Sequence, residues 1–244
     1  MARAACIAEK GCSDIEESLA KMILLENISK EFRSGRGYVK ALDDVSFTIE
    51  MHSTTVLFGK SGSGKTTLLN CIGGLDRPET GKVTVFGIDI HSLSERELCL
   101  FQRENVGFIF QHSNLLSYLS VFRNIAFPLE LNGFDKGRIK KRVHELLDVT
   151  GLRGIDKAMP DELSGGEAQR VAFARAIAHS PKLILADEPT ASLDSETGMN
   201  LVRFMFEMGK EQDCIMIIAT HDREVMKLAD TKIPMRDGKV IKED

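Results

Sequence analysis

Residues 54–67 read TTVLFGKSGSGKTT, and this stretch decides the fold. Its first five residues are apolar or β-branched, which predicts a strand buried on both faces. The glycine-rich residues 59–66 then match the pattern Gly-x-x-x-x-Gly-Lys-Ser/Thr, and Leu68, Leu69 and Ile72 predict a helix behind them. A strand, such a loop and a helix in this order form a phosphate-binding loop, because backbone N–H groups and the helix N-terminus point at one anion.

The loop also predicts specific contacts with a nucleotide. Lys65 is expected to reach the β and γ phosphates, and the Thr66 hydroxyl is expected to ligate Mg²⁺. The loop residues expected to bind the nucleotide are Gly59, Lys60, Ser61, Gly62, Ser63, Gly64, Lys65, Thr66 and Thr67. A glycine-rich turn that matches by chance is the competing interpretation, and the flanking strand and helix argue against it.

Further apolar runs predict an α/β fold with a mostly parallel core sheet. VGFIF (residues 106–110), LILA (183–186) and IMIIA (215–219) are apolar throughout, as strands covered on both faces should be. The runs MILLENI, VSFTI and KVTVFG suggest a smaller antiparallel β subdomain. The final run KIPMRDGKVI predicts a hairpin that turns at Asp237 and Gly238.

A helical stretch lies between the second and third core strands. Ile139, Val143, Leu146 and Leu147 fall on one face of a helix that Asp135 starts and Gly151 ends. We therefore expect an α-helical subdomain, at about residues 112–163, inserted into a single domain that spans residues 23–244. Residues 1–22 make a poor signal peptide and are expected to form a disordered tail outside the fold.

Polar side chains follow the predicted core strands and suggest the rest of a catalytic site. Asp187 is placed to hold Mg²⁺ through water, and Glu188 is placed to take a proton from an attacking water. Gln111 can offer its amide oxygen to the metal and orient the water, and His221 can contact the γ phosphate. An isolated Asp-Glu pair would more often be a helix cap or a solvated loop, and a lone glutamine after a strand is usually only a loop residue.

Composition excludes several classes of protein. The 244 residues carry a net charge of -4, which gives no general attraction to nucleic acid. The basic run at Arg138 and residues 140–142 is therefore read as a solvated helix face. The five cysteines lack zinc spacing and suggest reduced thiols in the cytosol. No apolar run approaches the length needed to span a bilayer.

A second anion-binding element stands at residues 163–170, LSGGEAQR, before another predicted helix. With the phosphate loop, Gln111, LILADEP, ASLD and His221, it resembles the nucleotide-binding domain of ATP-binding cassette (ABC) transporters over residues 23–244. The resemblance implies the ABC ATPase fold, with its core sheet, antiparallel β subdomain and inserted helices, and it implies hydrolysis of ATP with Mg²⁺.

The resemblance also implies a homodimer, because the LSGG signature of this family acts on the partner's nucleotide. Ser164, Gly165 and Gly166 of one chain would contact the γ phosphate that Lys65 of the other chain holds. Asp194 would contact the partner's phosphate loop. Ser164 is also a suitable N-cap, and this structural role is compatible with the functional one.

Adenine recognition rests on one aromatic residue. Phe32 stands where the family often has a tyrosine that stacks on the base, and it could equally be a core residue. Three other residues differ mildly from those that are frequent in the family. Lys60 stands in place of a proline, Thr66 stands in place of a serine, and Glu167 stands in place of a glutamine.

Several stretches resemble the branch that serves lipoprotein release and macrolide export, including GGLDRPETGKV and ELSGGEAQRVAFARAI. This branch implies two transmembrane permease subunits, a periplasmic or extracytoplasmic adaptor in some members, and a peripheral position on the cytoplasmic face of the membrane. Residues 112–130 would face the permease. The apolar cluster Leu115, Leu116, Tyr118 and Leu119 there fits either a groove for a permease helix or the subdomain core.

Three alternative functions share these motifs. A septal cell-division ABC ATPase is close kin, and a soluble ABC-type ATPase that acts on DNA or ribosomes has the same site. Chromosome-type members insert long coiled coils between Gln111 and the signature, for which residues 112–163 leave no room. A regulatory subunit that does not hydrolyse ATP is disfavoured, because every catalytic group is present. The sequence does not name the transported substrate.

Overall fold

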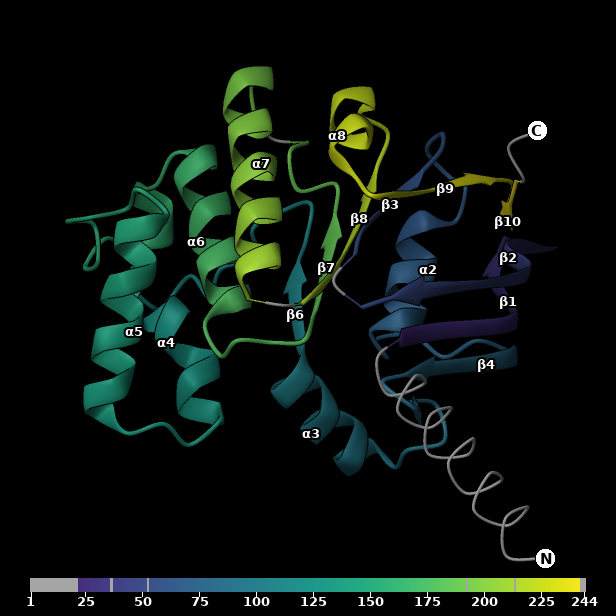
Figure 1. Cartoon of the computed structure of the whole chain (residues 1–244), viewed down its shortest axis with the longest axis horizontal. Coiled ribbons are helices and arrows are strands. Elements are labelled where there is room, and N and C mark those ends of the chain that lie inside the picture. Colours follow the sequence, from purple (N-terminus) through teal and green to yellow (C-terminus); the bar gives the residue numbers. More distant parts are fainter. Residues whose placement is uncertain (1–21, 36, 52, 192, 213, 242–244) are drawn as a thin grey trace, which may run out of the picture.

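The computed structural model describes residues 22–35, 37–51, 53–191, 193–212 and 214–241 (Figure 1). The first strand begins at Met22, one residue before the expected domain boundary. The expected disorder of the rest of the tail concerns residues 1–21, which lie outside the described residues. The reduced state of the cysteines stays a prediction; of those described, Cys71 and Cys214 are buried and Cys99 is exposed.

The core of the fold is a six-stranded sheet in the order β10-β9-β3-β8-β7-β6. Its strands are β3 (Thr54–Phe58), β6 (Val106–Ile109), β7 (Leu183–Asp187), β8 (Ile215–Thr220), β9 (Thr231–Arg236) and β10 (Lys239–Val240). All neighbours are parallel except β9 and β10, which form an antiparallel hairpin. The predicted, mostly parallel core sheet is confirmed. The hairpin turns at Asp237 and Gly238 as expected, and both have positive φ angles, of 50° and 77°.

A second, antiparallel sheet has the order β2-β1-β4-β5. Its strands are β1 (Met22–Ser34), β2 (Gly37–Glu50), β4 (Thr80–Val85) and β5 (Ile88–Asp89). The long β1–β2 hairpin has register shifts between Leu25 and Glu31, which mark irregular pairing in its middle. The predicted antiparallel β subdomain is thus confirmed.

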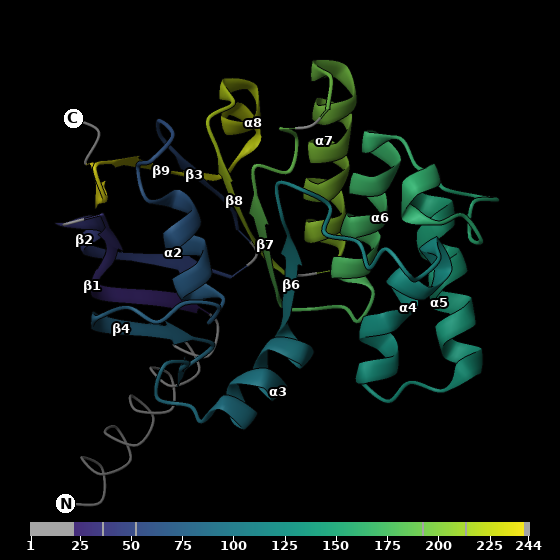
Figure 2. The same cartoon turned by 180° about the vertical axis from the view of Figure 1, so that it is seen from behind.

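Helices cover both faces of the core sheet (Figures 1 and 2). The helix α2 (Lys65–Ile72) lies between the core sheet and the antiparallel sheet and contacts both. On the other face, α6 (Gly165–Ile177) and α7 (Ser195–Glu211) pack together. The helix α3 (Glu95–Asn105) leads into β6, and the short α8 (Arg223–Leu228) joins β8 to β9.

Alternating side chains of the core strands divide the core into two layers. Leu57, Leu185 and Ile217 point to the layer that contains α2 and the antiparallel sheet. Val56 and Ile218 point to the layer that contains α6 and α7. The inner strands β6, β7 and β8 are apolar at nearly every position because alternate residues pack into different layers, and both layers are buried.

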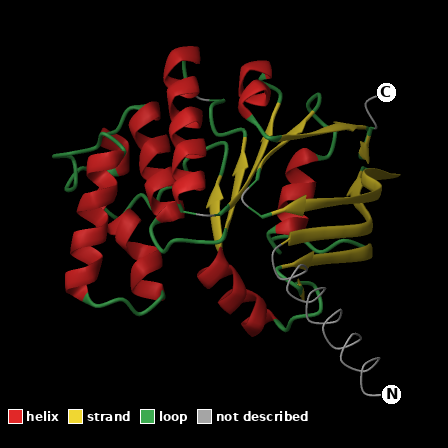
Figure 3. Cartoon of the chain, viewed as in Figure 1, coloured by secondary structure: helices red, strands yellow, loops and turns green. Residues whose placement is uncertain are grey.

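Three helical elements lie between β6 and α6, at the end of the molecule away from the antiparallel sheet (Figure 3). They are α4 (Val121–Leu131), α5 (Lys136–Val149) and the short 3-10 helix η1 (Pro160–Glu162). The side chain of Asp135 caps α5 by accepting from Arg138 N, and the predicted apolar face of α5 is buried. These helices fall within residues 112–163, and the division of the chain into a helical subdomain there remains a prediction.

Candidate functional site

The phosphate loop lies between the end of β3 and the start of α2, as the sequence predicts. Gly64 stands before the first helical residue with φ 99°, and no side chain caps this helix N-terminus. A Cβ on Gly64 would lie 2.3 Å from the carbonyl oxygen of Ala41, so only glycine fits here. The uncapped N–H groups at the start of α2 face the pocket and leave a place for an anion.

The loop holds Lys65 firmly in position. This side chain is only 6% exposed, and its ammonium donates to the carbonyl oxygens of Gly59 at 2.8 Å and Lys60 at 3.2 Å. Ser63 is also buried, and its hydroxyl has no hydrogen-bond partner. A buried hydroxyl without a partner is unusual, and a bound phosphate oxygen would accept a hydrogen bond from it.

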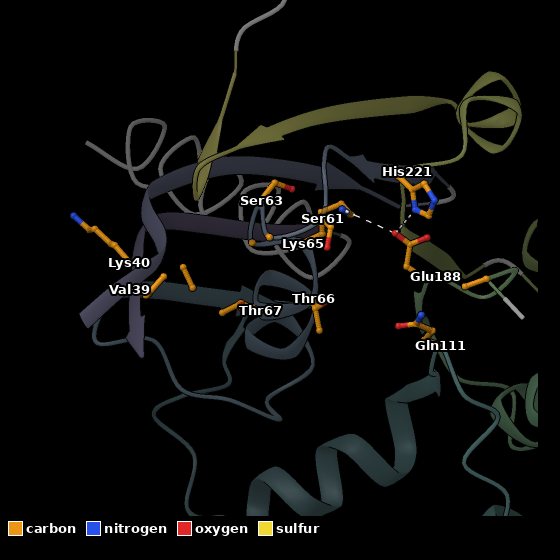
Figure 4. A pocket seen from close by; sticks show the side chains of 14 residues that line it. Val39, Lys40, Ser61, Ser63, Lys65, Thr66, Thr67, Gln111, Glu188 and His221 are labelled. Carbon is orange, nitrogen blue, oxygen red and sulfur yellow. Dashed lines mark hydrogen bonds and ion pairs between the residues drawn. The ribbon is translucent and has the colours of Figure 1, made fainter. Parts of the chain in front are cut away.

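Two carboxylates meet the loop at the carboxyl end of β7, and Figure 4 shows that of Glu188. Asp187 Oδ2 accepts from the Thr66 hydroxyl at 2.9 Å, while Asp187 Oδ1 is buried without a partner. Burial raises the pKa of Asp187 above its ordinary value, and the bond from Thr66 opposes this shift. Within the described part of the chain, no group of three or more His, Cys, Asp or Glu side chains forms a metal site.

Glu188 points into the pocket because its backbone turns sharply. Its φ of 43° is in the left-handed region, and its N–H donates to Ala219 O at 2.8 Å. A non-glycine residue in this region is strained by about 1–3 kcal/mol, and such strain clusters at functional sites. Glu188 Oε1 lies 2.9 Å from His221 Nδ1 and 4.0 Å from Lys65 Nζ (Figure 4).

A pocket of about 380 Å³ lies among these groups. Asp187 does not line it and contacts it through Thr66, which does. The pocket brings together residues 61–67 of the loop with Gln111, Glu188 and His221. Gly59 and Lys60 do not line this pocket, and they contribute through their carbonyl oxygens. The pocket can hold a phosphate group beside a carboxylate and an imidazole, which is the arrangement that phosphoryl transfer to water requires.

Part of the lining was not predicted from the sequence. Val39, Lys40 and Ala41 of β2 and Ala191 after β7 also line the pocket. Phe32 does not line it: this residue pairs with Val39 across the β1–β2 hairpin and is 42% exposed. The Lys30 ammonium lies 5.2 Å from the centre of its ring. Phe32 is therefore a surface residue of the described chain and not a core residue.

The signature residues lie outside this pocket. None of Ser164, Gly165, Gly166 and Asp194 lines it. Ser164 caps α6 in a reciprocal pair with Glu167, whose Oε2 accepts from Ser164 N at 2.8 Å and Ser164 Oγ at 2.6 Å. These bonds hold the pKa of Glu167 below its ordinary value. Asp194 caps α7 by accepting from Thr197 N.

Comparison with known proteins identifies the family. The family model described as ABC transporter matches residues 42–191. This chain belongs to the ABC transporter family. It is an ABC-type ATPase, the ATP-binding and ATP-hydrolysing subunit of a transporter, with the ABC ATPase fold expected from the sequence.

Two relatives of this ABC ATPase are similar over most of its length. An uncharacterized ABC transporter ATP-binding protein of Mycobacterium tuberculosis is 40% identical over 220 residues, which are 90% of this chain and 89% of the relative. The methionine import ATP-binding protein MetN of Carboxydothermus hydrogenoformans is 42% identical over 223 residues, which are 91% of this chain and 66% of MetN.

The structure of the ABC ATPase also resembles solved ones. The ATP-binding cassette MJ0796, solved as a dimer in a post-hydrolysis state with ADP and Pi, superposes with a TM-score of 0.85 and 35% identity. The match covers 91% of this chain and 97% of MJ0796. Among the described residues, no helix is both long and apolar enough to cross a membrane.

Proposed function

We propose that two copies of this ABC ATPase close head to tail around two Mg-ATP molecules and drive a pair of permease subunits. The observation that carries this proposal is that the catalytic pocket is lined by the phosphate loop, Gln111, Glu188 and His221, but not by the LSGG segment. A second copy would supply Ser164–Gly166 and Asp194 to the open side. The dimeric structures of MJ0796 support this arrangement.

The residues present fit Mg²⁺ bound together with the nucleotide. Asp187 Oδ1 is a buried oxygen without a partner, and the Thr66 hydroxyl lies beside the same carboxylate. Gln111 lines the same pocket and would add its amide oxygen. Few protein ligands are needed, because Mg²⁺ keeps waters and takes phosphate oxygens. When bound, the ion would neutralise charge that develops on the phosphates.

Hydrolysis in this site needs one proton acceptor. Glu188 would take a proton from the water that attacks the γ phosphorus, and His221, at 2.9 Å, would hold this carboxylate in place. Lys65 would bind the β and γ phosphates from its position under the loop. The adenine ring would lie along β2, near Val39 and Ala41, with Phe32 on the same hairpin as the proposed stacking residue.

Gly166→Asp tests the head-to-tail dimer. A Cβ at residue 166 would meet Thr197, Arg170 and Leu193 at 3.4–3.7 Å, which is ordinary contact, so the variant should fold. Its carboxylate would repel the partner's γ phosphate and prevent closure. We expect ATP hydrolysis to disappear while the monomer still binds ATP, and Gly166→Asn is the uncharged control. Loss of ATP binding by the isolated Gly166→Asp monomer would contradict the model.

Permease docking is proposed at a groove beside residues 112–130. This groove of about 260 Å³ is lined by apolar side chains that include Phe108, Phe110, Leu116 and Phe127. Leu115 instead packs against the core, and Tyr118 is 74% exposed. Phe127 is exposed and the other three are half-buried, and accessible apolar side chains around a groove suit an amphipathic helix of a partner.

Leu116→Glu separates the docking role of this residue from a structural one. Since Leu116 lines the groove, we expect membrane association with the permease to be lost at an unchanged melting temperature. Leu115→Glu is the matched comparison and should lower the melting temperature, because Leu115 packs on the core. Native protein that fractionates entirely as cytosolic, with no membrane protein crosslinked through this segment, would favour the soluble ABC ATPase alternative.

The class of transported substrate is proposed from the branch of the family that the sequence resembles. The stretches quoted above favour lipoprotein release or export, with a peripheral position on the cytoplasmic face of the cell membrane and an extracytoplasmic adaptor in some systems. The likeness to MetN favours methionine import as the second candidate. A neighbouring gene for a four-helix permease with a large extracytoplasmic domain would support the export branch, and uptake of labelled methionine that depends on this chain would support import. The septal cell-division role remains the third alternative.

A further inference from the structure

A second pocket lies behind the phosphate loop, and we call it the rear pocket. Its volume is about 570 Å³, and its lining includes Phe58, Lys60, Arg223, Met226, Lys227 and Lys232. Ligand pockets commonly measure roughly 300–1,000 Å³. The rear pocket shares only His221 with the catalytic pocket. The backbone of Gly59 and Lys60 lies between them: its carbonyl oxygens hold Lys65, while the Lys60 side chain lines the rear pocket.

The rear pocket carries uncompensated positive charge. Lys227 pairs with Glu224 at 2.6 Å, but Lys60, Arg223 and Lys232 form no ion pair with any residue that the structure describes. These three cations come from the phosphate loop, α8 and β9. The three cations therefore do not form a charged stripe along one solvated helix. Because they come together from three elements around one pocket, they produce a positive electrostatic potential inside it.

The interior of the rear pocket is apolar. Phe58, at the end of β3, and Met226, on α8, are half-buried and line it beneath the cations. A ligand that fills this space would therefore combine negative charge at one end with an apolar body at the other. Arginine and lysine together suit a phosphate dianion, because guanidinium binds two of its oxygens and ammonium adds a point charge.

We propose that the rear pocket binds a small phosphorylated molecule with an aromatic or other apolar body, at a site separate from the ATP pocket. The phosphate would lie among Lys60, Arg223 and Lys232, and the apolar body would contact Phe58 and Met226. This site needs neither the dimer nor the permease, so it stands independently of the proposed function.

Calorimetric titration with phenyl phosphate tests the site, with saturating ADP present so that the catalytic pocket is filled. We expect one molecule to bind per chain, more tightly than inorganic phosphate and more weakly as salt is raised. Arg223→Ala and Lys232→Ala should each weaken binding about tenfold, the effect of losing one charge-assisted hydrogen bond. Lys82→Ala is the control, since Lys82 is exposed on β4 and outside the rear pocket.

Chemical labelling of the unmodified chain provides a test that no folding defect can affect. Pyridoxal 5′-phosphate, an aromatic phosphate aldehyde, forms an imine with a nearby lysine that borohydride then reduces. With ADP bound, we expect mass spectrometry to find the label on Lys60, Lys227 or Lys232, and phenyl phosphate to prevent it. Absence of phenyl phosphate binding in the presence of ADP, equal affinity for inorganic phosphate, or equal weakening by Lys82→Ala would overturn the proposal.

Discussion

Asp187→Asn should make the nucleotide-free ABC ATPase more stable and its response to Mg²⁺ weaker. In the wild-type chain, Asp187 Oδ1 is buried without a hydrogen-bond partner, and burial opposes the charge of this group. An unsatisfied buried polar group costs about 1–3 kcal/mol. Asparagine keeps the shape and the acceptor for Thr66 but removes the charge. We expect a gain of about 1 kcal/mol, or about 2–4 °C in melting temperature.

Binding of Mg-ADP should make the wild-type chain more stable than Asp187→Asn. Mg-ADP at one hundred times its dissociation constant stabilises a protein by about 2.7 kcal/mol, which is about 5–10 °C for a chain of this size. The wild-type chain should show this rise with Mg²⁺ and a smaller one with EDTA. The melting temperature of Asp187→Asn should rise by the smaller amount with Mg²⁺ and with EDTA alike, because the group proposed to hold the ion has lost its charge.

Differential scanning fluorimetry measures the melting temperature of each chain in four conditions: with and without ADP, each in Mg²⁺ or in EDTA. Asp135→Asn is the control, because asparagine caps α5 about as well as aspartate and should leave every melting temperature unchanged. The reasoning would be refuted by a nucleotide-free Asp187→Asn chain that melts below the wild type. An unchanged effect of Mg²⁺ on the variant would refute the metal role alone.

Four further predictions concern the catalytic pocket and the signature. Burial raises the pKa of Asp187 in the folded chain, so ionisation of this group destabilises the fold. The destabilisation is complete above the raised pKa and absent below the unfolded value of about 3.9. The melting temperature of Asp187→Asn should therefore exceed that of the wild type by more as the pH is raised from 4 towards neutral. Glu188→Gln should lower ATP turnover roughly 100- to 10,000-fold and accumulate an ATP-bound dimer on size exclusion; near wild-type turnover would exclude Glu188 as the base. Gly64→Ala should lower the melting temperature far more than Gly62→Ala, since both have positive φ but only residue 64 has a backbone oxygen, at 2.3 Å, in the way of a Cβ. Glu167→Gln should strengthen ATP-driven dimerisation in sedimentation, because it removes a negative charge from the signature while glutamine still closes the capping box; equal or weaker association would contradict the trans contact.

The sequence predicted most of the core because its signals are local. The inner strands β6, β7 and β8 come from nearly uninterrupted apolar runs, and such a run has few alternatives to a strand covered on both faces. The N-caps Asp135 and Ser164 were also visible, because a capping residue acts on N–H groups within three positions of itself. The candidate catalytic set followed largely from one rule: residues just after parallel strands meet at one edge of the sheet, as Gln111, Glu188 and His221 do.

Contacts that depend on distant packing were not predictable. Val39, Lys40 and Ala41 reach the pocket because the β1–β2 hairpin folds over the phosphate loop, and nothing in their own stretch of sequence indicates this approach. The position of Phe32 depends on register shifts in the same hairpin, which alter which side chains face the pocket. The rear pocket was missed for the same reason, since Lys60 is far in the sequence from Arg223 and Lys232.

The N-termini of α2 and α6, which belong to the phosphate loop and the signature, differ in a way that bears on the order of assembly. At α2, no side chain accepts a hydrogen bond from the first N–H groups of the helix, and the Ser63 hydroxyl has no hydrogen-bond partner. At α6, Ser164 and Glu167 already satisfy one another. An anion at α2 therefore gains bonds that the chain otherwise lacks, whereas an anion at α6 competes with the Glu167 carboxylate. ATP should accordingly bind first to the phosphate loop, and the signature of the second chain should engage only a phosphate that is already held there.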